Sequence, residues 1–177
     1  SQGQMVAFAD ALGPDPALAD VDDAALERSV TTMAAELAAA ECAWLARLAE
    51  LVVRKVWARQ GCRTPGQWLS WRIGMAPATA REKVRVALQL RELPQLRARF
   101  AAGTLSYSKV RALTRVATPD LEPLLLAWAD AAPAAHLEQL VASWRRGLVD
   151  SASGLNLVDG CQGLGRILRG CRVENDA

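Results

Sequence analysis

The stretch from Asp22 to Gln60 contains neither proline nor glycine, and its apolar residues recur at helical spacing. Steps of four and three residues alternate along it, through Leu26, Val30, Met33, Leu37, Ala40 and Trp44. The stripe then shifts to Leu48, Leu51, Val52 and Val56. The pattern predicts one long helix. Because such a helix exceeds the usual length in globular proteins, we expect it to pack on its own chain or on a second subunit.

The charges at the two ends of this stretch suit a helix. Asp22 and Asp23 lie at its start, where the helix dipole favours acids. Arg54, Lys55 and Arg59 lie near its end, where the dipole favours bases. Gly61 is a typical C-terminal stop, so we expect the helix to end there.

Proline, glycine and capping residues divide the following chain into short helices. Thr64-Pro65 and Ser106 are typical helix starts, whereas Gly74 and Gly103 are typical stops. No alternating strand pattern precedes residue 150. The sequence thus predicts an all-α multi-helix bundle with one long N-terminal helix and helix-turn-helix-like hairpins. The expected short helices cover residues 64–73, 77–93, 94–103, 106–117, 118–131 and 133–147.

The composition changes at both ends of the chain. Residues 1–21 form an N-terminal arm, in which a short helix is expected around Gln4–Leu12 before a loop with Gly13 and Pro14. Residues 22–149 form the helical domain. Residues 150–177 form a glycine-rich tail, interpreted either as poorly ordered or as the start of a second, truncated domain.

Composition excludes several classes of protein. A chain of 177 residues that is 51% hydrophobic is too apolar to be disordered, and long enough for one core. No apolar run reaches the ~18–20 residues of a membrane span, and no secretory signal opens the chain, so we expect a cytoplasmic protein without membrane association. Neither a disulfide framework, a metal site nor a cofactor is expected from one histidine, His136, and four scattered cysteines, Cys42, Cys62, Cys161 and Cys171.

The formal net charge of +2 conceals a strong asymmetry. Residues 1–50 carry a net charge of −7, residues 51–115 one of +12, and residues 116–177 one of −3. Such a block indicates a partner of opposite charge. Two interpretations remain open: a basic face that pairs with the acidic N-terminal helix, and a nucleic-acid interface.

Residues 65–90 read as a helix-turn-helix candidate. Leu69 and Ile73 supply an apolar inner face for its first helix, Ser70 the small crossing residue, Gly74 the turn and Met75 a plug. The second inner face comprises Ala80, Val84, Ala87 and Leu88. Because the usual spacing places the last contact at position 83 rather than 84, the turn must be one residue longer, or the match is accidental. The competing interpretation is an ordinary αα-hairpin with snorkelling arginines.

A DNA-binding role would use the outward positions of this hairpin and of the next. Arginine commonly reads guanine in the major groove, and threonine contacts bases or phosphates. The hairpin at residues 94–117 adds a second helix start with hydroxyl groups, suited to phosphate. Of the six tryptophans, Trp71 is the candidate for contacts outside the core. The expected DNA-binding residues are Arg72, Thr79, Arg81, Lys83, Arg85, Ser106, Ser108, Lys109, Arg111 and Arg115.

Three motifs in the basic segment resemble a known family. They are a W-L-x-x-x-x-G block at Trp68–Gly74, R-E-L-P at Arg91–Pro94, and A-A-G-T-L-S at Ala101–Ser106 followed by K-V-R-A-L. This run resembles the 13E12 repeat family, a helical domain of unknown function often found upstream of an HNH endonuclease in actinobacteria and their mobile elements. The resemblance covers residues 22–146. It implies an association with DNA.

The chain departs from the nuclease part of that resemblance. An HNH centre needs several histidines and asparagines, whereas this chain has His136, Asn156 and Asn175. No phosphate loop or nucleophile elbow is present either, so we expect no catalytic residue and no enzyme activity. Two functions remain: a DNA-binding domain that targets or regulates a nuclease, and a protein-interaction or oligomerisation module, including a homodimer, built on the long acidic helix.

Overall fold

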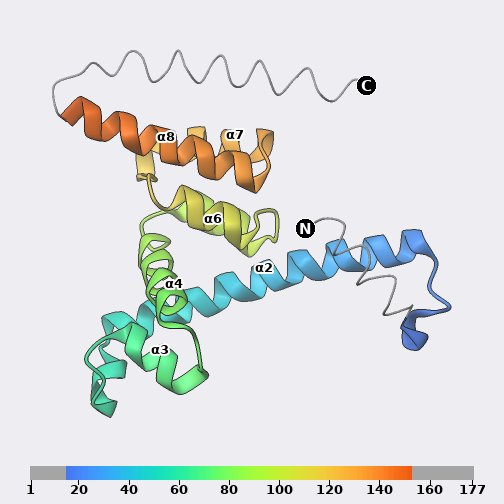
Figure 1. The fold of residues 1–177 in the computed structure, drawn as a ribbon, viewed down its shortest axis with the longest axis horizontal. Coiled ribbons are helices and arrows are strands. Elements are labelled where there is room, and N and C mark those ends of the chain that lie inside the picture. Colours follow the sequence, from blue (N-terminus) through green and yellow to red (C-terminus); the bar gives the residue numbers. More distant parts are fainter. Residues whose placement is uncertain (1–14, 153–177) are drawn as a thin grey trace, which may run out of the picture. The chain divides into compact units, whose positions relative to one another are not determined.

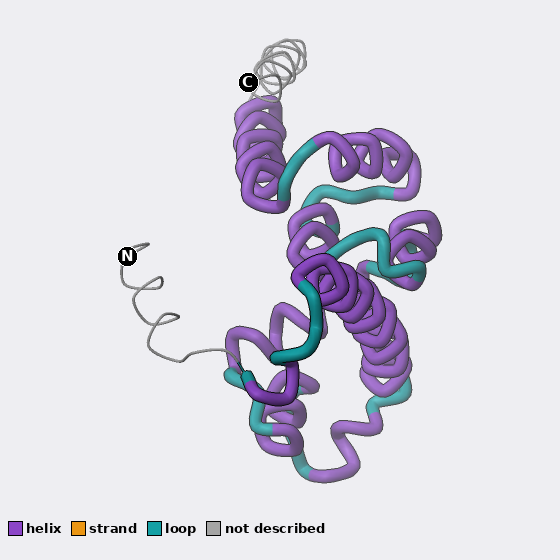
Figure 2. The backbone as a smooth tube through the Cα atoms, turned by 90° about the vertical axis from the view of Figure 1, so that its right-hand side faces the viewer, coloured by secondary structure: helices purple, strands orange, loops and turns teal. Residues whose placement is uncertain are grey.

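The computed structural model describes residues 15–152, and the side chains of these except residues 145 and 147–152. Within that range the backbone forms seven α-helices, three short 3-10 segments and no strand (Figure 2). The α-helices are α2 (Asp23–Val53), α3 (Pro65–Ile73), α4 (Pro77–Gln89), α5 (Pro94–Ala101), α6 (Tyr107–Leu113), α7 (Glu122–Ala131) and α8 (Ala134–Ala152). The predicted all-α fold with a long N-terminal helix is confirmed. The expected helix around residues 4–12 lies outside the described residues.

The chain divides into two compact units, residues 1–34 and 35–177. In the first unit the described part is a 3-10 turn, η1 (Pro16–Leu18), followed by the first twelve residues of α2. Asp22 begins this helix, because its carboxylate accepts a hydrogen bond from the backbone N–H of Ala25 at 2.9 Å. None of residues 15–34 is buried.

The long helix ends earlier than the sequence predicts. α2 stops at Val53, and Lys55 takes the left-handed conformation with φ of 53°. A 3-10 segment, η2 (Val56–Gln60), follows it up to Gly61. The β-branched residues around this point lower the local helix propensity, and the indole of Trp57 donates a hydrogen bond to the carbonyl of Val52 at 3.4 Å.

The second unit holds a single core. Its fully buried side chains come from the second half of α2 and from the shorter helices, for example Leu45, Leu69, Phe100 and Leu137. Figure 1 shows α6 alongside α8, and the two helices pack closely on each other. Both views place α3 at the opposite end of this unit from α8 (Figures 1 and 2).

Most predicted helices of this unit exist, but several boundaries differ. α4 ends at Gln89 rather than near Leu93, and Leu93 itself is non-helical, as expected of a residue before proline. α6 ends at Leu113, and a 3-10 turn, η3 (Pro119–Leu121), precedes α7. The sequence predicts a stop at Gly147, but α8 continues to Ala152. An isolated glycine lowers helix stability without ending a helix.

Candidate nucleic-acid interface

The hairpin of α3 and α4 is built by local signals at both of its helix starts. The hydroxyl of Thr64 accepts a hydrogen bond from the N–H of Gln67 at 3.1 Å, and prolines occupy the first position of each helix. Gly74 ends α3 with φ of 69°, in the left-handed region that glycine adopts without strain. A three-residue connection then leads into α4.

The inner face of the hairpin agrees with the expected one only in part. Leu69, Ala80 and Ala87 are buried, as the sequence predicts. Ile73, however, is 52% exposed, so it is not part of the buried inner face. Gly66 of α3 lies close to α4, because a Cβ at Gly66 would lie 3.4 Å from Cγ of Arg81.

Positive charge without a counter-charge is concentrated in this part of the chain. No Asp or Glu occurs between Lys55 and Arg81. The five cations in that stretch are all exposed, and none makes an ion pair with any described residue. They are Lys55, Arg59, Arg63, Arg72 and Arg81.

Side-chain hydrogen bonds join two of the segments that carry these cations to α3. The indole of Trp68 on α3 donates to the amide oxygen of Gln60 at 2.9 Å, which ties η2 to α3. The N–H of Arg63 donates to the side chain of Gln67 at 2.8 Å, which orders the connecting loop. Since α3 also packs on α4, the segments that carry these cations contact one another through α3. We call these five residues the free cation cluster.

Two exposed apolar side chains, Trp71 and Ile73, flank Arg72 on α3. Trp71 is 63% exposed, and the guanidinium of Arg72 lies 5.9 Å from the centre of its ring. Ile73 follows at the end of the helix. Exposed tryptophan next to arginine suits contacts with sugars and bases as well as phosphates.

Among the residues expected from sequence, Arg72, Thr79 and Arg81 are exposed, whereas Lys83 has partners within the chain. Its ammonium group pairs with the carboxylate of Glu41 on α2 and lies 3.2 Å from the ring centre of Tyr107 on α6. Burial, followed by the charges of Glu41 and Glu82, raises the pKa of Tyr107 to about 12. Lys83 therefore links three helices.

Arg85 is also occupied within the fold. Its guanidinium donates to the carbonyl oxygens of Thr114 at 3.0 Å and Arg111 at 3.1 Å, and so satisfies the C-terminal end of α6. It also makes two hydrogen bonds of 3.0 Å to the carboxylate of Glu82. Hydrogen bonding from Arg85 lowers the pKa of Glu82, with Arg115 contributing to the same shift.

Three cations in and beside α6, in the second expected hairpin, also have partners within the chain. Arg111 pairs with Glu138, Arg115 pairs with Glu82 at 2.8 Å, and the ammonium of Lys109 donates to the carbonyl of Ala129 at 2.6 Å. The hydroxyl of Ser106 caps α6, whereas Ser108 is exposed. The structure therefore separates the ten expected residues into a free group on the first hairpin and a largely engaged group around α6.

Sequence reasoning missed Lys55, Arg59 and Arg63 as candidates for this surface. These three residues precede the helix-turn-helix candidate at residues 65–90, so no outward position of that motif includes them. The acid-free interval from Lys55 to Arg81 was visible in the sequence and is the signal that identifies them.

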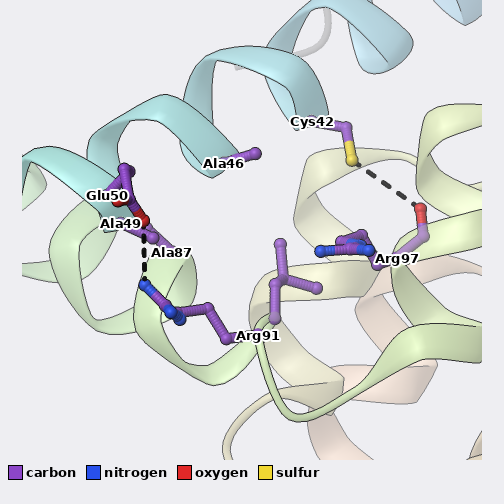
Figure 3. A pocket seen from close by; sticks show the side chains of 8 residues that line it. Cys42, Ala46, Ala49, Glu50, Ala87, Arg91 and Arg97 are labelled. Carbon is purple, nitrogen blue, oxygen red and sulfur yellow. Dashed lines mark hydrogen bonds and ion pairs between the residues drawn. The ribbon is translucent and has the colours of Figure 1, made fainter. Parts of the chain in front are cut away.

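A separate pocket of about 260 Å³ lies in the second unit (Figure 3). Its lining includes an ion pair between Arg91 and Glu50 at 3.4 Å and the thiol of Cys42, which donates to the carbonyl of Arg97 at 3.7 Å. Burial raises the pKa of the Cys42 thiol, so it stays protonated and is a poor nucleophile. The other lining residues are Ala46, Ala49, Ala87 and Leu90.

Two other kinds of site are absent from residues 15–152. No described helix is both long and apolar enough to cross a bilayer. Nor do three or more His, Cys, Asp or Glu side chains gather as metal ligands anywhere in that part of the chain.

Comparison with known proteins identifies a family whose function is unknown. The model of the family described as Domain of unknown function (DUF222) matches residues 6–156. No curated protein and no solved structure matches.

Proposed function

This chain belongs to the DUF222 family, for which no function is known, and we propose from its own residues that it binds double-stranded DNA through the hairpin of α3 and α4. The observation that carries the proposal is the free cation cluster, five exposed cations in an interval without a single acid. Phosphate binding by Lys and Arg releases condensed counterions, which is the main source of affinity for DNA.

Cations with partners are poorer candidates for this role. Lys83 and Arg85 would have to give up an ion pair or helix-capping bonds before they could bind phosphate. Breaking such partly buried contacts costs about 1–3 kcal/mol each. Lys83 and Arg85 instead hold α4 against α2 and α6.

The positions in the hairpin suggest separate roles for the free residues. Thr79 and Arg81 lie in the first turns of α4, the part of a recognition helix that meets base edges in a helix-turn-helix protein. Arg72 on α3 and the cations of the preceding segment are placed for phosphates, with Trp71 beside them. In this arrangement few side chains reach base edges, and contacts with phosphates supply most of the affinity for DNA.

Fluorescence anisotropy with labelled duplexes of unrelated sequence tests the proposal. We expect binding at about 50 mM salt, and a linear fall of log K with log salt concentration. A single strand of the same length should bind less tightly. Absence of duplex binding at low salt contradicts the proposal.

The resemblance to the 13E12 repeat family extends the proposal to a targeting or regulatory half of a mobile-element-type HNH nuclease, acting in the cytoplasm on DNA. The catalytic step would then belong to an HNH module, because this chain has a single histidine. We therefore predict that the chain does not nick supercoiled plasmid in the presence of Mg²⁺ or Mn²⁺. Metal-dependent nicking that persists through purification would contradict this assignment.

A protein-interaction module is the second candidate, and two ion pairs favour it. Glu41 pairs with Lys83 and Glu50 with Arg91, so acids of α2 already bind the basic segment within the chain. An intermolecular version would place acids of one chain on the free cation cluster of another. This second candidate predicts that the chain self-associates and does not bind DNA. Salt should weaken the self-association, and Arg72→Ala/Arg81→Ala should remove it.

A further inference from the structure

The first part of α2 carries an apolar stripe of exposed side chains. Val30 is 60% exposed, Met33 57% and Leu37 70%, and Leu26 lies one turn before them. An isolated helical segment of this length is marginally stable in water unless a partner covers its apolar face. The stripe therefore needs an occupant.

The stripe and the core-facing residues of α2 lie on different sides of the helix. At about 100° per residue, Met33 and Leu37 lie within roughly 20° of the direction of Leu26, whereas Ala35 lies about 180° away. The loop at Gly103 packs on Ala35, because a Cβ at Gly103 would lie 2.6 Å from the Ala35 carbonyl oxygen. The core residues Ala38 and Cys42 also face a different direction from the stripe.

We propose that the stripe binds the same stripe of a second copy of this chain, as a short antiparallel coiled coil. The two-fold axis would pass between Thr31 and Thr32. Leu26 of one copy would then face Leu37 of the other, and Val30 would face Met33. The pattern is self-complementary, as an interface with two-fold symmetry requires.

Charges beside the stripe favour this orientation and this occupant. In a parallel, in-register pair the flanking positions would bring Asp22 beside Glu27 and Glu36 beside Glu41, which is repulsive. In the antiparallel pair Glu27 flanks Ala34 and Glu36 flanks Ser29, so the like charges are separated. The antiparallel pairing thus relieves both repulsions while it buries the stripe.

Sedimentation velocity of the full chain at increasing concentration tests the association. We expect a monomer–dimer equilibrium, and Met33→Glu should weaken it at least about tenfold, since the new charge would be buried. Thr32→Glu is the matched control, because it adds the same charge at an exposed position on another face. It should change the dissociation constant by less than about twofold. A chain that stays monomeric overturns the proposal, as does an equal effect of both variants.

Disulfide trapping tests the orientation. Chains with Val30→Cys are mixed with chains carrying Met33→Cys under mild oxidation, and peptide mass spectrometry separates the new cross-links from the native cysteines. We expect the mixed disulfide between positions 30 and 33. A prevailing position-30 homodisulfide indicates a parallel pair and overturns the antiparallel proposal.

The chain's own residues 153–177 are the competing occupant. If they cover the stripe, the full chain is monomeric, and hydrogen exchange at residues 26–37 accelerates when they are deleted. That result would also overturn the proposal.

Discussion

At the scale of residues, two arginines one helical turn apart have different roles. Arg81 and Arg85 both lie on α4. Arg81 is exposed and unpaired within the described residues, whereas Arg85 completes the hydrogen bonding at the end of α6. Because the contacts of each guanidinium differ, replacing Arg85 should lower stability, and replacing Arg81 should lower affinity for DNA.

Tyr107, the single tyrosine of the chain, is half-buried against Lys83. Its pKa is raised to about 12, so the folded state favours the neutral phenol. This contribution to stability is present below the unfolded pKa of 10 and is lost as the pH rises towards 12. We predict that tyrosinate absorbance develops near pH 12 in the native protein and near pH 10 in denaturant. Native titration near 10 would contradict the buried phenol.

Glu122 tests a second contact at the residue scale. Its buried carboxylate accepts a hydrogen bond from the N–H of Leu96 at 2.8 Å, at the start of α5. Glu122→Ala should lower the free energy of unfolding by about 1–3 kcal/mol, because it leaves that N–H without its partner. Asp120→Ala, at an exposed position of η3, should change it by less than about 0.5 kcal/mol. Equal effects in denaturant titration would contradict the capping role.

At the scale of elements, local signals fix where helices begin better than where they end. Thr64 and Ser106 cap α3 and α6 as expected, because a side-chain oxygen reaches the N–H three residues later. The end of α2 at Val53 and the continuation of α8 past Gly147 depend on weaker local preferences and on packing. A single sequence does not reveal those boundaries.

Gly103 tests the contact between the α5–α6 loop and α2. Its φ of 73° and the 2.6 Å approach of a Cβ to the Ala35 carbonyl both oppose a side chain there. Gly61 has nearly the same φ, 74°, with nothing within 4 Å of its Cβ position. Gly61→Ala should therefore cost about 1–2 kcal/mol from strain alone, and Gly103→Ala clearly more. Similar losses by thermal unfolding would show that the close contact adds nothing.

At the scale of the whole molecule, the charge blocks of the sequence become interpretable once partners are known. The basic block of residues 51–115 holds fourteen cations, of which seven make ion pairs with described residues. Five of the others form the free cation cluster on the hairpin of α3 and α4 and the segment before it. The ion-paired cations thus fit the interpretation of a basic face that pairs with acids of the same chain. The free cation cluster fits the interpretation of a nucleic-acid interface.

The sequence was sufficient for the helical fold, the hairpin and the three exposed candidates on it, since these follow from caps, periodicity and charge. It was not sufficient for the roles of Lys83, Arg85 and Arg111. Their partners Glu41, Thr114 and Glu138 lie far away in the chain, so the pairing depends on tertiary packing.

The salt dependence of duplex binding by charge-matched variants tests the central claim most directly. Arg72→Ala/Arg81→Ala removes two free cations from the hairpin, and Arg28→Ala/Arg47→Ala removes two exposed cations of α2. If the hairpin holds the DNA, the first pair reduces the slope of log K against log salt by about two and weakens binding roughly tenfold for each arginine replaced. The second pair should leave the slope unchanged. Equal slopes for both variants would contradict DNA binding by the hairpin.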